Sequence, residues 1–127
     1  MKIQASLVAR SATRTCSEIS DLAGLAPDDC RERGETVRAG QTPSVETVWK
    51  LRGPSLLEST VEDSIDALLD RLAPHIDGLS RLPKDIALDI DCVIYREDGE
   101  QAPAIGLSRN AIHLLARLNA EFGASIY

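Results

Sequence analysis

Alternation of apolar and polar residues predicts three β-strands. The segment Lys2–Arg10 has an apolar side chain at every second position, and Val8 is the one apolar residue on its polar side. Val45–Arg52 and Ile86–Arg96 show a similar pattern. Because successive side chains of a strand point to opposite faces, each segment has an apolar side that faces the interior (the dry side) and a polar side that faces water (the wet side). We therefore expect a sheet with helices on one face and water on the other.

Apolar residues recur at helical spacing in three further segments. The first predicted helix begins at Thr15, which precedes a glutamate by three residues in a capping-box pattern, and it ends at Gly24. The second begins after Ser59 or Thr60. We expect it to kink or end just before Pro74, because proline lacks the N–H that a helix interior requires.

The third predicted helix begins at the cap residue Ser108 and ends at Gly123, which leaves only a brief last strand, Ala124–Tyr127. Before it, Glu97–Glu100 is typical of a hairpin turn, and Ala102–Leu107 is expected to return as a strand. The apolar stripe of this helix consists of Ile112, Leu115, Ala116, Leu118 and Phe122.

Together the elements follow the order β-α-β-α-β-β-α-β, and we expect one domain over residues 1–127. Two β-α-β units around one sheet indicate an α+β, ferredoxin-like sandwich, with a mainly antiparallel sheet of about five strands and three helices on one face. Residues 26–44 are polar and contain glycine and proline, so we interpret them as a long loop. Loops of that length are often functional or mobile.

The composition is that of a globular chain, with 43% hydrophobic and 27% charged residues. Residues 1–60 carry eight basic and eight acidic side chains, whereas residues 61–127 carry six basic and twelve acidic ones, for a net charge of -6. This balance argues against nucleic acid or an anionic membrane as a partner. The acidic half is either a solvated surface or a patch for a basic protein, so a protein partner or self-association stays open.

Cysteine usage predicts a cytoplasmic protein. Cys16, Cys30 and Cys92 are odd in number and widely spaced, whereas a secreted domain of this size more often has an even set. The start of the chain lacks the apolar core of a signal peptide, and no stretch is long enough to span a membrane. We interpret Cys16 and Cys92 as small buried thiols, with a reactive thiolate at a helix N-terminus as the alternative for Cys16.

Motifs for catalysis, metals and cofactors are absent or incomplete. Ser108 lacks the second glycine of a G-x-S-x-G elbow, so a helix cap explains it. His75 and His113 lack the spacing of metal ligands, and Gly34 and Gly40 belong to no phosphate-binding pattern. We therefore predict no catalytic residue, no metal and no cofactor.

One group of polar residues suggests a binding site. If the second and third predicted strands are neighbours, two basic and two acidic side chains share the open face, with a tyrosine near them. They either form cross-strand ion pairs or, if their surroundings separate the two carboxyl pKa values, act as acid and base. Trp49 points to the other side and is expected in the core. The candidate binding residues are Asp89, Asp91, Lys50, Arg52 and Tyr95.

Several short segments also form a familiar layout. They are Leu22–Pro27, Arg33–Glu35, Val48–Leu51, the acidic-aliphatic helix after Leu57, Leu107–Ser108 and Ile126–Tyr127. This layout resembles the bacterial family catalogued as domain of unknown function 4279, over almost the whole chain. The resemblance implies a small stand-alone or fused domain with no assigned activity, and it carries over no catalytic residues.

Three hypotheses follow. The favoured one is a non-enzymatic protein-interaction or ligand-binding module, of which an immunity-type neutralising role is one form. The second is a small hydrolase-like enzyme that uses Asp89 and Asp91, with Arg52 and Tyr95, on the open sheet face. The third is a structural or oligomerisation module in which sheet faces or edges pair between copies. It is supported by apolar residues on the supposed wet face, which are Val8, Val48 and Val93.

Overall fold

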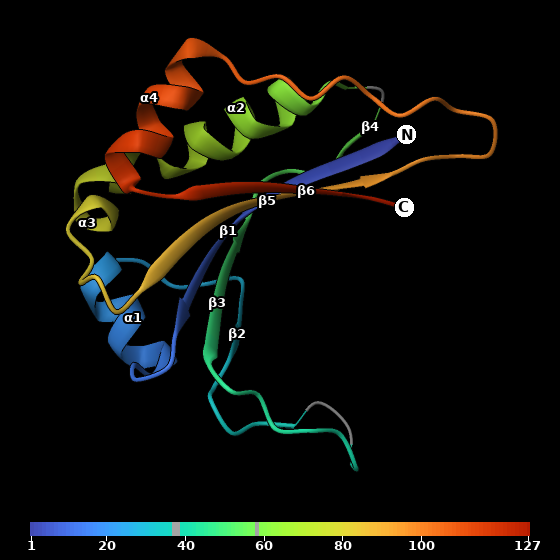
Figure 1. The fold of residues 1–127 in the computed structure, drawn as a ribbon. Helices are drawn as coiled ribbons and strands as arrows, with labels where there is room; N and C mark the ends of the chain where they lie inside the picture. Colours follow the sequence, from blue (N-terminus) through green and yellow to red (C-terminus); the bar gives the residue numbers. More distant parts are fainter. Residues whose placement is uncertain (37–38, 58) are drawn as a thin grey trace.

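The computed structural model describes residues 1–36, 39–57 and 59–127 and shows an open mixed sheet covered by helices (Figure 1). The strands follow one another across the sheet in the order β2-β3-β1-β5-β6, and β4 pairs with the start of β1. All pairings are antiparallel except that of β5 with β6, which is parallel. The strands are β1 (Lys2–Ser11), β2 (Asp29–Arg31), β3 (Thr47–Arg52), β4 (Leu56–Leu57), β5 (Ala87–Tyr95) and β6 (Glu121–Ile126).

The helices gather on one side of this sheet (Figure 1). The three predicted helices are present, and the second continues through a short 3-10 turn into a further five-residue helix. The expected end before Pro74 is confirmed, because α2 stops at Leu72 and the proline lies in the 3-10 turn. The bounds are α1 (Cys16–Ala23), α2 (Val61–Leu72), η1 (Ala73–His75), α3 (Ile76–Ser80) and α4 (Arg109–Leu118).

Side-chain caps start all three long helices where the sequence predicts them. The hydroxyl of Thr15 accepts a hydrogen bond from the backbone N–H of Glu18 at 3.1 Å, and that of Thr60 accepts one from Asp63 at 3.0 Å. Ser108 accepts from the backbone N–H of Ala111 at 3.0 Å. Each cap pairs one of the N–H groups that a helix start leaves without a partner, a contribution of about 1 kcal/mol per cap.

The dry side of the sheet packs against the helices as the alternation predicts. Alternate residues of β1, β3 and β5 are fully or almost fully buried there. Trp49 has no exposed surface, and its indole N–H donates to the Ser20 hydroxyl of α1 at 3.0 Å, which confirms its place in the core. The core strand residues on this side are Ile3, Ala5, Leu7, Ala9, Trp49, Leu51, Leu88, Ile90, Cys92 and Ile94.

The predicted strand Ala102–Leu107 is wrong. The turn at Glu97–Glu100 is present, with the Glu100 N–H donating to the Glu97 carbonyl at 3.1 Å, but the chain then runs to α4 without joining the sheet. The outer edge of β5, where a returning strand would pair, is occupied by β6 instead. The element order therefore differs from β-α-β-α-β-β-α-β, and the ferredoxin-like order is not confirmed.

The predicted end of the third helix is also wrong. α4 ends at Leu118, and Asn119 takes the left-handed C-cap position with φ of 51°, which asparagine tolerates better than most residues. The chain from Glu121 is therefore free to form β6, which is longer than the brief strand expected at Ala124–Tyr127. The buried stripe of α4 is Ala111, Leu115 and Leu118, whereas Ile112 is 55% exposed.

Candidate functional site

The two strands that carry the predicted site are not neighbours, because β1 lies between them. Lys50 of β3 lies opposite Val8 of β1, which in turn lies opposite Asp89 of β5. In the next row Ser6 separates Arg52 from Asp91. The four polar groups do share the open face, but the condition that their strands are neighbours is not met.

Arg10 of β1 is the residue that meets the two aspartates. Its Nε lies 3.3 Å from Oδ2 of Asp89, and its Nη2 lies 3.7 Å from Oδ2 of Asp91. A third, longer ion pair of 3.9 Å links it to Glu46. The alternation pattern places Arg10 on the wet side of its strand, so the signal was present, but it does not say which strands are adjacent. At 36% side-chain exposure these ion pairs each contribute a few tenths of a kcal/mol.

Arg52 turns away from the aspartates toward β2. Its Nη2 lies 3.2 Å from Oδ2 of Asp29, and its backbone N–H donates to Oδ2 of Asp28 at 2.7 Å. Asp28 also binds Arg71 of α2, whose Nη1 lies 2.5 Å from the same oxygen. The hydrogen bond from Arg71, together with that from the Arg52 N–H, lowers the pKa of Asp28 to about 2. Asp28 therefore links the margin of the sheet to the helix layer.

A hollow of about 240 Å³ lies on the open face between β2, β3, β1 and β5. Val8 and Val48 form its apolar floor, and Val8 is only 1% exposed, so the prediction that it is an exposed apolar residue is wrong. The register places Arg31 beside Val48 and Asp29 beside Lys50. The charged residues that line the hollow are Arg10, Asp29, Arg31, Lys50 and Asp91.

Two of the basic side chains that line the hollow make no direct ion pair with the described residues. Within residues 1–36, 39–57 and 59–127, neither Arg31 nor Lys50 has a hydrogen bond or an ion pair through its side chain. The acidic groups beside them are engaged elsewhere, Asp29 with Arg52 and Asp91 with Arg10. Among the described residues, the hollow thus presents two cations without a partner above an apolar floor.

The predicted site residues therefore divide among different places. Lys50 and Asp91 line the hollow, while Arg52 pairs with its rim residue Asp29. Asp89 borders a second, larger hollow of about 590 Å³ at the starts of β5 and β6. Tyr95 lies at the other end of β5 and stacks on Tyr127, with ring centroids 5.6 Å apart. The sequence pattern does not point to Arg31, because β2 lies inside the segment 26–44, which has the composition of a loop.

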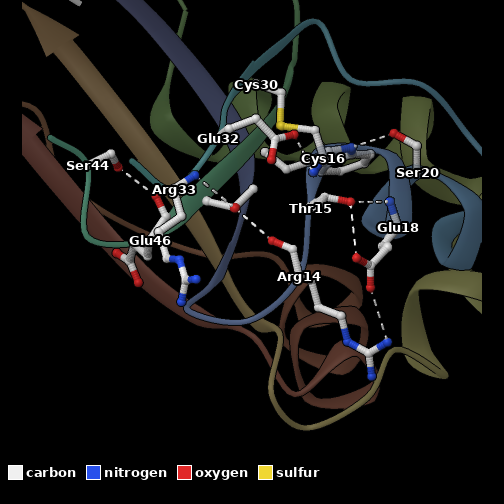
Figure 2. The surroundings of a disulfide bond; sticks show 12 residues. Arg14, Thr15, Cys16, Glu18, Ser20, Cys30, Glu32, Arg33, Ser44 and Glu46 are labelled. Atoms are coloured by element: carbon white, nitrogen blue, oxygen red, sulfur yellow. Dashed lines mark hydrogen bonds and ion pairs between the residues drawn. A yellow bond between two sulfur atoms is a disulfide. The ribbon is translucent and has the colours of Figure 1, made fainter. Parts of the chain in front are cut away.

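A disulfide bond holds β2 in place. Cys30, the central residue of β2, is bonded to Cys16 at the start of α1 (Figure 2). The prediction of Cys16 as a buried thiol, with a reactive thiolate as its alternative, is therefore wrong. Cys92 is buried as predicted, and its burial raises the pKa of its thiol. Cytoplasmic location stays a prediction. Its argument from cysteine usage is weaker, because two of the three cysteines form a disulfide.

Hydrogen bonds around the disulfide fix the same segment (Figure 2). The backbone N–H of Cys16 donates to Oε1 of Glu32 at 2.7 Å, so a carboxylate sits at the positive end of α1. The backbone N–H of Arg33 donates to the hydroxyl of Thr47 at 3.2 Å, and that hydroxyl donates to the carbonyl of Arg14 at 2.7 Å. Together with the contacts of Asp28 and Asp29, these bonds anchor the β2 margin on both sides of Cys30.

The remaining chemical candidates have structural roles or no grouping. Besides capping α4, the Ser108 hydroxyl donates to Oδ1 of Asp66 at 2.9 Å, which agrees with the predicted cap. His75 and His113 join no cluster: among the described residues, no three histidine, cysteine, aspartate or glutamate side chains group as metal ligands would. In the same part of the chain, no helix combines the length and apolarity needed to cross a membrane.

Comparison with known proteins identifies the family. Neither the curated proteins nor the solved structures include a match to this chain. The model of the family described as Domain of unknown function (DUF4279) matches residues 1–127. The resemblance predicted from the short segments is confirmed, and the chain belongs to this family.

Proposed function

We propose that this chain is a non-enzymatic binding module that takes the carboxylate or phosphate group of a small ligand in the hollow on its open sheet face. The observation that carries the proposal is the pair of cations, Arg31 and Lys50, which line the hollow without a protein partner among the described residues. An anion placed between them would gain charge-assisted hydrogen bonds, which are stronger than neutral ones.

The surroundings of the two cations support an anionic ligand. Asp29 and Asp91 are the acidic residues of the rim, and each is already paired with an arginine. These ion pairs partly offset the negative charge beside Arg31 and Lys50, although the whole chain is acidic. The floor of Val8 and Val48 provides apolar contact for the carbon skeleton of a ligand, as in most small-molecule sites.

The hydrolase hypothesis is less well supported by the same geometry. Asp89 and Asp91 share one guanidinium, that of Arg10, so each of the two carboxylates is already engaged in an ion pair. An acid and base pair needs two carboxyl groups in different surroundings, whereas these two face the same cation. Tyr95, the expected assistant, stacks on Tyr127 away from them. The immunity-type role stays a prediction, for which the fold offers no specific support.

Titration with inorganic phosphate and with citrate, followed by NMR of the backbone amides, tests the binding proposal. We expect shifts at Val8, Val48 and Lys50. Either Lys50→Ala or Arg31→Ala should weaken binding about tenfold or more, because each removes one charge-assisted contact.

Lys84→Ala is the matched control, because it removes one positive charge from the lining of the second hollow. It should leave anion affinity within about threefold of the parent. The proposal is wrong if neither anion shifts the amides around Val8, or if Lys84→Ala weakens binding as much as Lys50→Ala does.

A further inference from the structure

Strand β6 lies at an open edge of the sheet. It pairs with β5 along one side, and in the part of the chain that the structure describes, no backbone hydrogen bond joins its other side to another element. Its residues from Gly123 to Ile126 are exposed. Figure 1 shows β6, in red, along the margin of the sheet. An unpaired strand edge offers a row of N–H and C=O groups to another strand.

The hydrogen bonds at the end of β6 identify which residues face outward. The N–H of Tyr127 donates to the carbonyl of Ile94 at 2.8 Å, and its carbonyl accepts from the N–H of Arg96 at 3.0 Å, so Tyr127 bonds inward to β5. Backbone groups of alternate residues in a strand point to opposite edges. The N–H and C=O groups of Phe122, Ala124 and Ile126 therefore point outward.

The composition of β6 does not block pairing. Natural edge strands are often protected by lysine, proline or an inward charge. β6 has the sequence Glu-Phe-Gly-Ala-Ser-Ile, in which the single charge lies at the first position. The opposite margin, β2, is only three residues long and carries two charged residues beside the bonded Cys30.

We propose that β6 pairs antiparallel with β6 of a second copy of this chain, with the twofold axis at Ala124. In this register Phe122 lies opposite Ile126 of the second copy, and Ile126 lies opposite Phe122 of the second copy. Apolar residues therefore meet on one face. Glu121 lies opposite Tyr127, so the two carboxylates do not oppose each other. The outward groups of the two strands form about six backbone hydrogen bonds.

The dimer joins the two sheets at the margin opposite β2, away from the hollow. The inference depends on β6 alone and does not depend on the proposed ligand. Each copy carries a net charge of -6, so long-range repulsion opposes association. Salt screens this repulsion, and the dimer should strengthen as salt rises from about 0.05 to about 0.5 M.

Sedimentation equilibrium of the full chain at several concentrations and both salt levels tests the proposal. Ala124→Pro should raise the dimer Kd at least about tenfold, because proline removes the central outward N–H and leaves the inward bonds to β5 in place. Ala124→Ser keeps the N–H and should stay within about threefold of the parent. A parent that is monomeric at every concentration, or an Ala124→Pro variant that dimerises like the parent, overturns the proposal.

Crosslinking provides a test that does not depend on how proline is tolerated. Opposed residues of a hydrogen-bonded antiparallel pair have Cα atoms about 5.5 Å apart, within the range of a disulfide. Oxidised glutathione should therefore join two Ala124→Cys chains, the two thiols giving up two protons and two electrons as the glutathione disulfide is reduced to two thiols. Ser125→Cys is the control, because position 125 lies opposite Gly123. Equal crosslinking of the two variants contradicts the register.

Discussion

The two margins of the sheet are built in opposite ways. β2 is three residues long and is fixed by a disulfide through Cys30, by ion pairs of Asp28 and Asp29, and by hydrogen bonds on both sides. β6 is six residues long and is held by its ladder with β5 and by the half-buried Phe122. One margin is secured by specific crosslinks, the other by backbone pairing and packing.

This difference separates two roles on one small sheet. The secured margin supplies Asp29 and Arg31 to the hollow, so the backbone that carries Arg31 is held in position before a ligand arrives. The open margin is available to a second chain. Because β3, β1 and β5 lie between the two margins, pairing through β6 leaves the hollow of each copy accessible.

Removal of the disulfide should have the largest effect on the difference between the two margins. The double substitution Cys16→Ser with Cys30→Ser should lower the free energy of unfolding by about 3 kcal/mol, the value expected for a closed loop of about 15 residues. Urea unfolding of both proteins, with and without dithiothreitol, measures this. The reductant should destabilise the parent to a similar extent and leave the variant unchanged. A parent that is equally stable with and without dithiothreitol would show that the bond does not secure β2.

The free margin should respond to loss of packing instead. Phe122→Ala should cost about 2 kcal/mol, roughly half of the value for a fully buried phenylalanine, because its side chain is only partly buried against the core. Ser125→Ala, an exposed change in the same strand, should stay within about 0.5 kcal/mol of the parent. We expect the Phe122→Ala loss to be the same in dithiothreitol, and a loss that appears only after reduction would contradict the division between the margins.

The smallest expected effect concerns Asp28 and depends on pH. Its folded pKa of about 2 lies below the ordinary value of 3.8, so its contribution to stability is present above about pH 4 and disappears as the pH falls to about 2. Since the side chain is one third exposed, we discount the shift for screening and expect Asp28→Asn to cost about 1 kcal/mol at pH 7. Unfolding curves at pH 7, 4 and 2 measure the difference in unfolding free energy between parent and variant, which should shrink as the pH falls. A difference that persists at pH 2 would assign the loss to another cause.

Local patterns predicted the parts of the fold that local physics determines. The alternation in β1 and β5 identified the side chains that face the helices, since strand side chains alternate whatever the neighbouring strand is, but it did not show that Ser6 and Val8 on the open face are buried too. The hydroxyls of Thr15, Thr60 and Ser108 marked helix starts, because a cap depends only on the next three residues.

Long-range pairing is what the sequence could not supply. Periodicity gave Asp89 and Lys50 the same face but could not show that β1 separates their strands and brings Arg10 to the aspartates. The segment Ala102–Leu107 has strand-like residues but does not join the sheet, because β6 takes its place beside β5. β2 was missed because three residues between polar neighbours carry too little periodicity, and its bond to Cys16 is a contact across the chain.

Trp49 provides a fluorescence signal for the β2 margin. As the sole tryptophan of the chain, it dominates the fluorescence, and it lies opposite Cys30 of β2 while its indole binds Ser20 of α1. A change in its emission would therefore report the separation of the short margin or of the first helix in real time, without any label.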